Sequence, residues 1–345
     1  MKTMLMSAAA LTLLAASVQA EQSLRVTGLV STHKFHTALE KAFYEELSEK
    51  TGIELAVNFN PLDVVGVDME DTLRMVRTGA FDIVESTVGA AARDDAFLEG
   101  IDLIGVSTSM EQLEEAVAAF RPELEKRLAE KFNAKAMTLW PYGPQVFYCN
   151  AEIGGVADLS GLKVRSYTAT MSSLLEAVGA TPVTLSFKEV YPALQRGVVD
   201  CAITSPTSGN TGNWPEVTTH FLPLGISWSV NGHFMNLDTW NGFSADEQAK
   251  LTEAFAEFEQ GFWDLARQNN GWAIACNTGQ EDGCENYNLF SMALVEPTAA
   301  DQEMITKAAM EQVLPGWGES CNEGFTECTS IWNATVGKVR GIELN

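Results

Sequence analysis

Residues 158–204 constrain the fold more than any other part of the chain. They include the sequences DLSGLKVRS and GATPVTLSFKEVYPALQRGVVDCAIT. Residues 164–166 read as a short buried strand whose one charged side chain is Arg165. Ser186 with Glu189 three residues later forms a capping box that opens a helix, and the apolar run after that helix reads as a second strand. A strand, a helix and a further strand in this order are typical of an α/β protein with a parallel sheet.

This order of motifs resembles the solute receptors of the tripartite ATP-independent periplasmic (TRAP) transporters, of the DctP type. Weaker similarity extends over nearly the whole chain, through TGIELAVNFNP, RMVRTGAFDI and NLDTWNGFSADEQAKL. In that family the arginine of the GLKVR strand binds the carboxylate of the transported solute, and Arg165 occupies its position. The resemblance implies a two-lobed α/β periplasmic binding protein fold, with a hinged cleft and a long helix that spans both lobes.

The amino terminus has the features of an export signal. Residues 1–20 contain Lys2, an apolar run over residues 4–14 and the small-residue ending Val18-Gln19-Ala20. The run is too short to span a bilayer, and the alternative is a first core helix of the domain. The prediction is therefore a mature chain that begins near Glu21 and resides in the bacterial periplasm.

The remaining length suits two lobes better than one ordinary core. Strands are expected at residues 24–29, 53–59, 81–84 and 136–140, with helices between the first three. Ser244 with Glu247 is a capping box that opens an amphipathic helix of about 28 residues. Because the chain crosses between lobes more than once, we expect lobe I at residues 21–144 plus 232–275 and lobe II at 145–231 plus 276–345.

The charge balance excludes some partners. The chain has 22 Lys and Arg against 46 Asp and Glu, which gives a net charge of −24. Such acidity argues against nucleic acid and anionic lipid as partners. An anionic solute would also be repelled at long range, although salt screens that repulsion beyond about 8 Å and a local arginine can still bind it.

Six cysteines in an exported chain indicate disulfides rather than a metal site, because no Cys-x-x-Cys or clustered histidine spacing occurs. Two pairs are close neighbours in sequence, and the other two cysteines each lie at a predicted strand. Of the fifteen possible pairings, the sequence favours Cys276–Cys284, Cys321–Cys328 and Cys149–Cys201. No metal ion or other cofactor is expected.

Arg165 is the leading candidate for ligand binding, since a guanidinium offers a planar fork of donors that suits a carboxylate or sulfonate. An internal ion pair is the alternative. Many family members carry a second arginine in a Gly-x-Arg setting, where this chain has Gly143-Pro144-Gln145. One matched arginine predicts a compact monoanion with a partly apolar or cyclic body, not a dicarboxylate. Lys34 is the residue that could supply a second positive charge.

Other candidates follow predicted strands, where ligands of open α/β sheets bind. Aromatic side chains could build an apolar wall of the cleft, although most aromatics belong to cores: Trp140, Tyr142, Phe147, Trp214 and Trp228. Polar side chains in turns could bind the ligand, although such turns are often without function. The expected ligand-binding set is Arg165, Tyr142, Gln145, Thr204, Ser205, Trp228, His33, Lys34, Ser86 and Thr87.

The function expected from these features is capture of a small organic anion by a monomeric receptor, which delivers it to the membrane permease of a TRAP transporter. One alternative is a solute receptor of an ABC transporter or of a sensor system. A second alternative is a periplasmic enzyme acting on a small acid. The sequence offers it little support, because it contains no His-Glu-x-x-His, Gly-x-Ser-x-Gly or glycine-rich phosphate motif.

Overall fold

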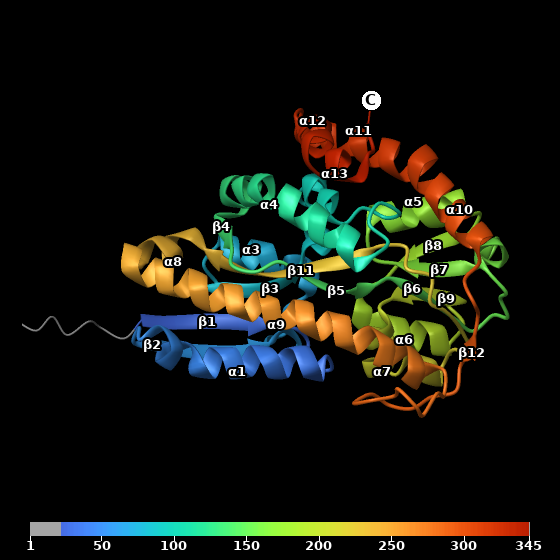
Figure 1. The fold of residues 1–345 in the computed structure, drawn as a ribbon, viewed down its shortest axis with the longest axis horizontal. Helices are drawn as coiled ribbons and strands as arrows, with labels where there is room; N and C mark the ends of the chain where they lie inside the picture. Colours follow the sequence, from blue (N-terminus) through green and yellow to red (C-terminus); the bar gives the residue numbers. More distant parts are fainter. Residues whose placement is uncertain (1–21, 345) are drawn as a thin grey trace, which may run out of the picture.

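A computed structural model describes residues 22–344, and the predicted export signal at residues 1–20 lies outside them. Within the described range, no helix combines the length and the apolar character that a membrane span requires. The chain forms two lobes, each built on a six-stranded sheet with helices on both faces (Figure 1). We call the lobe that contains β1 the first lobe and the lobe that contains β7 the second lobe.

The sheet of the first lobe has the order β2-β1-β3-β11-β4, with β5 also paired to β11. Strands β1, β2 and β3 are parallel, whereas β11 is antiparallel to β3, β4 and β5. The strands are β1 (Gln22–Gly28), β2 (Leu55–Pro61), β3 (Ile83–Thr87), β4 (Ala134–Ala136), β5 (Trp140–Pro144) and β11 (Trp228–Asn236). The predicted alternation of strands and helices at the amino terminus is therefore present as a parallel sheet.

The sheet of the second lobe has the order β12-β10-β6-β9-β7-β8. Its strands are β6 (Val146–Cys149), β7 (Lys163–Ser166), β8 (Thr181–Thr184), β9 (Cys201–Thr204), β10 (His220–Leu222) and β12 (Ala293–Leu294). Strand β7 is parallel to both neighbours, β8 and β9. Arg165 thus lies on a central strand, near the carboxyl edge of three parallel strands.

The helices cover both faces of each sheet. In the first lobe, α1 lies on one face and α3 and α4 on the other; in the second, side chains of α5 and α6 belong to separate apolar clusters (Figure 1). The α-helices are α1 (Lys34–Thr51), α2 (Leu62–Val65), α3 (Thr72–Arg77), α4 (Met110–Phe132), α5 (Ala169–Ala177), α6 (Phe187–Gln195), α7 (Pro206–Thr211), α8 (Leu237–Gly242), α9 (Ala245–Asn277), α10 (Ala299–Ala308), α11 (Leu314–Gly324), α12 (Cys328–Trp332) and α13 (Lys338–Arg340). Short 3₁₀ segments complete the list: η1 (Met69–Asp71), η2 (Val88–Ala91), η3 (Ala96–Ile101), η4 (Val156–Leu159) and η5 (Trp214–Glu216), together with two π-helical segments, η6 (Ala309–Val313) and η7 (Asn333–Gly337).

Helix α9 spans both lobes, as predicted. It has 33 residues and begins at the predicted capping box of Ser244 and Glu247. At about 1.5 Å per residue it is roughly 50 Å long. Its amino-terminal half buries Phe255 and Phe262 in the core of the first lobe, whereas its carboxyl-terminal part contacts α7 of the second lobe (Figure 1).

The carboxyl-terminal helices differ from the expected arrangement. The sequence assigned all of residues 276–345 to lobe II, but Trp317 and Trp332 belong to the apolar core of the first lobe. Their indole N–H groups donate to the carbonyl oxygens of Ala96 and Gly100, each at 2.8 Å. The chain therefore returns to the first lobe after α10.

One expected strand, at residues 136–140, is wrong. The structure has two short strands there, β4 and β5, which both pair with β11. Regular pairing is interrupted between them. There Met137 N–H donates to the carbonyl oxygen of His233, and the Thr138 hydroxyl accepts from the backbone N–H of His233 and lies 2.7 Å from its ring Nδ1. An apolar run does not reveal such an interruption, because buried residues continue through it.

Three disulfides are present, and they join the predicted pairs: Cys149–Cys201, Cys276–Cys284 and Cys321–Cys328. The first joins the adjacent strands β6 and β9, in which the two cysteines are direct partners in register. No free cysteine remains among residues 22–344.

Candidate functional site

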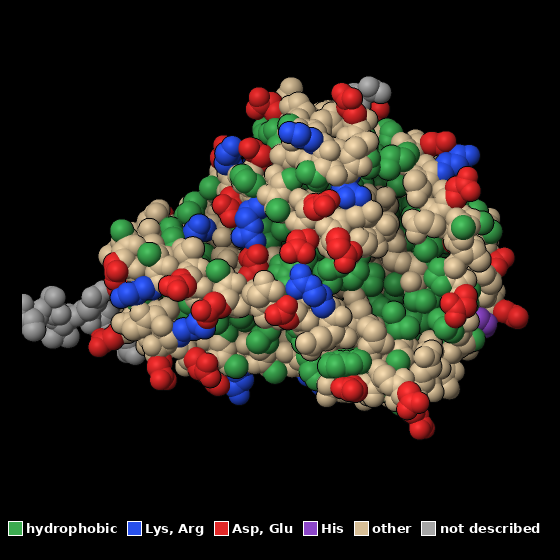
Figure 2. Space-filling model, viewed as in Figure 1, with side chains coloured by type: hydrophobic (Ala, Val, Ile, Leu, Met, Phe, Trp, Pro, Cys, Tyr) green, Lys and Arg blue, Asp and Glu red, His purple; other side chains and the backbone are tan. Residues whose placement is uncertain are grey.

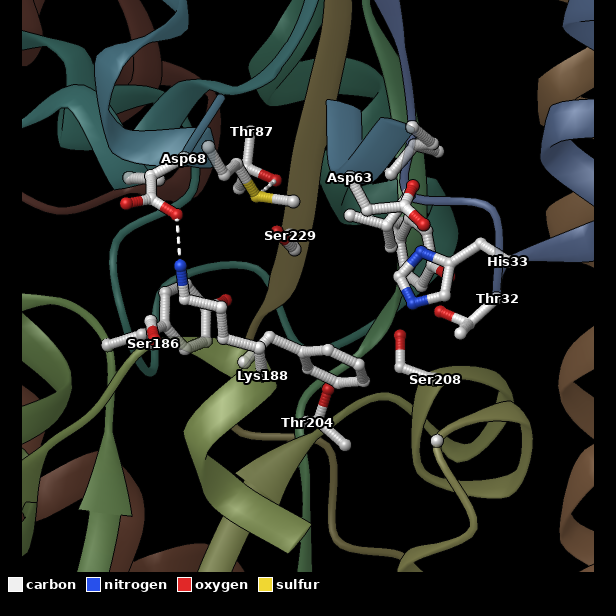
Figure 3. Close-up of a pocket in the computed structure, with 18 of the residues that line it drawn as sticks. Thr32, His33, Asp63, Asp68, Thr87, Ser186, Lys188, Thr204, Ser208 and Ser229 are labelled. Carbon is white, nitrogen blue, oxygen red and sulfur yellow. Dashed lines mark hydrogen bonds and ion pairs between the residues drawn. The ribbon is translucent and has the colours of Figure 1, made fainter. Parts of the chain in front are cut away.

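A cavity of about 450 Å³ lies between the two lobes. The first lobe contributes the turn after β1, the segment 63–70 and the end of β3, while the second contributes the ends of β7 and β9 and the start of α6. Its floor comes from strands that cross between the lobes, with Tyr142 and Gln145 on one crossing and Ser229 and Asn231 on the other. Figure 3 shows side chains from the two lobes facing each other across this space.

Arg165 is a buried cation in the cavity wall, with 3% of its surface exposed. Its Nε donates to the carbonyl oxygen of Leu185 at 3.0 Å, and Nη1 donates to that of Ile203 at 2.8 Å. Among the described residues, no carboxylate oxygen lies within 4.0 Å of its nitrogens. Burial lowers the pKa of Arg165 to about 10, so the side chain remains charged at neutral pH. The internal ion pair considered from sequence is therefore absent among residues 22–344.

Aromatic rings surround the guanidinium. The Arg165 Cζ atom lies 5.0 Å from the ring centre of Tyr167 and 5.9 Å from that of Trp214. These contacts stabilise the charge by cation–π attraction, but they leave the outer N–H groups free to donate. The combination of an oriented guanidinium and an apolar wall suits a carboxylate attached to a partly apolar body.

Six of the ten residues expected from sequence line the cavity: Arg165, Tyr142, Gln145, Thr204, His33 and Thr87. Burial lowers the pKa of His33 to about 4, so its imidazole is neutral near pH 7. It therefore offers hydrogen bonds but no second positive charge.

The other four expected residues lie off the cavity wall. Lys34 is exposed, with its ammonium 5.0 Å from the ring of Phe35. Ser205 accepts from the backbone N–H of Ser208 and so caps α7. The last two are buried: Ser86, whose hydroxyl accepts a hydrogen bond from Thr72, and Trp228, which packs in the core of the first lobe.

Of the five aromatics that could form a wall, Tyr142 and Trp214 line the cavity, whereas Trp140 and Phe147 belong to cores. Phe187 and Tyr167 also line it, although the sequence did not single them out. Tyr167 was accessible to sequence reasoning, because it follows Arg165 by two residues and side chains two apart share one face of a strand.

An ion pair across the cavity was also missed. Lys188 at the start of α6 reaches the carboxylate of Asp68 in the first lobe, with Nζ 2.5 Å from Oδ1 (Figure 3). Two further carboxylates of the first lobe, Asp63 and Glu70, line the same cavity. The first-lobe side of the cavity is therefore acidic, and its one neighbouring lysine is already paired.

A buried acidic pair lies in the first lobe beneath the cavity floor. Glu40 and Glu85 are both fully buried; Glu40 accepts from the backbone N–H of Leu29 and lies 3.0 Å from His233 Nε2. Burial raises the pKa of Glu40 to about 8, and burial together with the charge of Glu40 raises that of Glu85. The pair is therefore at least partly protonated near neutral pH.

This pair predicts a pH dependence of stability. A carboxyl group whose pKa is raised on folding stabilises the fold fully below its unfolded pKa near 4.5, and that contribution is lost as the pH rises toward the folded value. The buried histidines 33, 36 and 233 act in the opposite sense, but only below their unfolded pKa of 6.5. The free energy of unfolding should therefore fall from pH 6.5 to 8. The fall is about 1.4 kcal/mol per pH unit for each proton that the folded protein binds and the unfolded chain does not.

Denaturant unfolding at several pH values measures this decline. Glu85→Gln should flatten it, because the glutamine keeps an acceptor for Asn231 but does not titrate. A free energy of unfolding that stays constant or rises between pH 6.5 and 8 would contradict the prediction.

Within the described part of the chain, no group of three or more His, Cys, Asp or Glu side chains could hold a metal ion. The cavity itself contains one histidine and three carboxylates, with Asp68 engaged by Lys188 and Asp63 accepting from Ser31. The chemistry that this arrangement offers is recognition of an anion by Arg165, with carboxylates on the first-lobe side and neutral hydrogen-bonding groups on the floor.

Comparison with known proteins gives a family match. The family model for bacterial extracellular solute-binding proteins, family 7, matches residues 27–309. The C4-dicarboxylate-binding periplasmic protein DctP of Rhodobacter capsulatus is 28% identical over 241 residues, covering 68% of this chain and 71% of that protein. The sialic acid-binding periplasmic protein SiaP of Vibrio cholerae is 28% identical over 188 residues, or 54% of this chain and 58% of that protein.

Solved structures share the fold at lower identity. A TRAP periplasmic solute-binding protein from Rhodoferax ferrireducens with bound malonate has a TM-score of 0.79 and 19% identity, covering 92% of this chain and 98% of that one. DctP6 of Bordetella pertussis, an extracytoplasmic solute receptor that binds pyroglutamic acid, has a TM-score of 0.78 and 21% identity, covering 93% and 100%.

Proposed function

This chain belongs to family 7 of the bacterial extracellular solute-binding proteins, and on that premise we propose that Arg165 binds the carboxylate of a small organic acid in the cavity between its lobes. The observation that carries the proposal is the guanidinium itself, which is buried, charged and without a carboxylate partner in the described chain. A buried charge is costly unless it is paired. A ligand carboxylate, held by two parallel N–H···O bonds, supplies the missing partner.

The mechanism is a shift between open and closed lobe arrangements. The strands β5 and β6 are joined through Pro144 and Gln145, and β10 is joined to β11, so short connections link the two sheets. A ligand that contacts both lobes stabilises the closed arrangement, because only there are all of its contacts made. The Lys188–Asp68 pair, which joins the lobes, forms in the same arrangement.

The closed, loaded receptor delivers its solute to the permease of a TRAP transporter in the membrane, and it acts in the periplasm as a monomer. Its family is extracytoplasmic, and its named relatives are binding proteins rather than enzymes. Transport therefore requires no reaction at Arg165. Acidic side chains spread over the visible face, with Lys and Arg among them, which gives nucleic acid no basic surface there (Figure 2).

A solute receptor of an ABC transporter is the alternative, and a long helix that spans both lobes is a feature implied by the resemblance to TRAP receptors. Helix α9 contacts elements of both lobes. This topology, together with the family match to residues 27–309, favours the TRAP type.

The bound solute should carry one negative charge, although the Rhodobacter relative is named for dicarboxylates. Arg165 is matched, whereas Gln145 replaces the second arginine and Lys188 is held by Asp68. A second carboxylate would meet the acidic first-lobe side, at a desolvation cost of several kcal/mol. We expect cyclopentanecarboxylate to bind at least about tenfold more tightly than cyclopentane-1,3-dicarboxylate.

Calorimetric titration of such matched pairs decides the matter, after a thermal-shift screen of carboxylates and sulfonates has found the preferred acids. Tighter binding of the dicarboxylates would refute the prediction. In that outcome Lys188→Met should remove the preference, since Lys188 is the cation that a second carboxylate could take from Asp68.

A further inference from the structure

Two buried amide groups on the cavity floor have oxygen atoms without a hydrogen-bond partner in the described chain. They are Gln145 Oε1 and Asn231 Oδ1, on side chains whose residues are 2% and 1% exposed. Both residues line the cavity. A buried polar atom is nearly always paired, and leaving it unpaired costs free energy.

The Gln145 amide is oriented by a backbone group. Its Nε2 donates to the carbonyl oxygen of Gly143 at 3.2 Å, which can only accept. The backbone of Gln145 is fixed as well, because its N–H donates to Ser227 and its carbonyl accepts from Ile226. One of the two N–H groups of the amide is thereby engaged, which fixes the orientation of the amide, and Oε1 is the atom without a partner in the described chain.

The Asn231 amide is oriented in the same way by an acid. Its Nδ2 donates to Glu85 Oε1 at 2.6 Å, and its position on β11 is set by register with Thr87 on β3. Again one N–H of the amide is engaged, and Oδ1 is without a partner in the described chain. Glu85 acts here as a positioning residue, since it lies behind Asn231 in the core of the first lobe and does not line the cavity.

We propose that the cavity floor is a second subsite, in which Gln145 Oε1 and Asn231 Oδ1 accept hydrogen bonds from an N–H or O–H group of the ligand. This inference rests on the proposed function, because it assumes that the carboxylate is held by Arg165. The ligand is then a hydroxy acid or an acid with an amide or lactam N–H. An acid whose other polar atoms only accept leaves both amide oxygens unpaired.

The charges nearby point the same way. Asp63, Asp68 and Glu70 are the acidic side chains on the first-lobe side of the cavity, and His33 is neutral. Carboxylates only accept when ionised. Of the two cationic donors in the cavity, Arg165 belongs to the carboxylate subsite and Lys188 is paired with Asp68. The two amide oxygens and the three carboxylates are acceptors and so favour donors on the ligand, whereas the neutral His33 adds a single N–H donor.

Three pairs of acids with equal charge and similar shape test the subsite by calorimetry. They are 3-hydroxy- and 3-methoxycyclopentanecarboxylate, 4-hydroxy- and 4-methoxybenzoate, and 5-oxopyrrolidine-2-carboxylate and 5-oxotetrahydrofuran-2-carboxylate. The first member of each pair has a donor that the second lacks. The donor-bearing acid of the best-bound pair should bind on the order of tenfold more tightly, as expected for one or two added hydrogen bonds.

The variants Gln145→Met and Asn231→Leu keep the side-chain size and remove one amide oxygen each. Either should reduce the preference for the donor-bearing acid and leave the affinity of its donor-free partner nearly unchanged. The two variants test the subsite separately, so one remains informative if the other does not fold. Thermal unfolding of each ligand-free variant shows whether it is folded.

Equal affinities within the pairs, tighter binding of the donor-free members, or no binding of any donor-bearing acid would overturn the subsite. Loss of binding in Arg165→Ala bears only on the carboxylate subsite. If every acid requires Arg165 for binding, but the N–H or O–H group of the ligand makes no difference, the proposed function stands and only the second subsite is overturned.

Discussion

Replacement of Arg165 by alanine should weaken binding of the acid by at least about 30-fold. Removing one partner of a buried charge pair costs about 2–5 kcal/mol, which corresponds to a loss of roughly 30-fold to several thousandfold in affinity. The ligand-free fold should tolerate the change. Arg165 makes two hydrogen bonds to backbone carbonyls but no ion pair within the described chain, and its removal also relieves the burial of a charge.

Calorimetry on Arg165→Ala measures the loss, with two control variants. Arg165→Lys keeps the charge but loses the planar fork, so its affinity should lie between those of wild type and Arg165→Ala. Arg196→Ala removes an exposed arginine of the same lobe that bonds only to Pro192 in its own helix, and it should bind normally. Near-native affinity in Arg165→Ala would remove the basis of the assignment.

The Cys149–Cys201 disulfide should contribute the most stability of the three disulfides. It closes a loop of 52 residues, and the chain-entropy treatment gives about 4 kcal/mol for such a loop. Both cysteines are fully buried on neighbouring central strands of the second sheet. The double variant Cys149→Ala, Cys201→Ala should therefore lower the free energy of unfolding by about 4 kcal/mol or more, since it also leaves a small cavity.

Denaturant unfolding compares this variant with Cys276→Ala, Cys284→Ala, which opens a loop of only 8 residues. The second variant should lose roughly 2.5 kcal/mol. A smaller loss for the 149–201 pair than for the 276–284 pair would contradict the loop-length argument.

Local signals in the sequence predicted much of the fold. The capping box at Ser244 begins α9, the box at Ser186 begins α6, and Gly52 ends α1 in a left-handed conformation. Each of these depends on residues within one helical turn, so no tertiary information is needed. The disulfides also followed from spacing, because two pairs are close neighbours and the third was what remained.

Long-range features could not be predicted in this way. Strand β11 crosses between the lobes and is antiparallel to β3, β4 and β5, which begin 88 to 145 residues earlier in the chain. The return of Trp317 and Trp332 to the first lobe is similar, since any apolar pocket could accept an indole. Neither arrangement has a local signature, because pairing partners are chosen by the whole fold.

The same distinction applies to the site. Arg165 was identified from its strand and from the resemblance, and Gln145 from a departure at a known position. The partners that shape the cavity chemistry, Asp68 for Lys188 and Glu85 for Asn231, are 120 and 146 residues away from them. Such pairs become visible only in the folded structure, because the first joins the two lobes and the second joins neighbouring strands of the first-lobe sheet.

The most direct test of the central claim is a crystal structure of the protein with the acid that binds most tightly in the thermal-shift screen. The carboxylate should lie between the lobes, with both oxygens within about 3 Å of Arg165 nitrogens. A well-ordered ligand whose carboxylate contacts Lys188 or another group, and leaves Arg165 without an anionic partner, would contradict it.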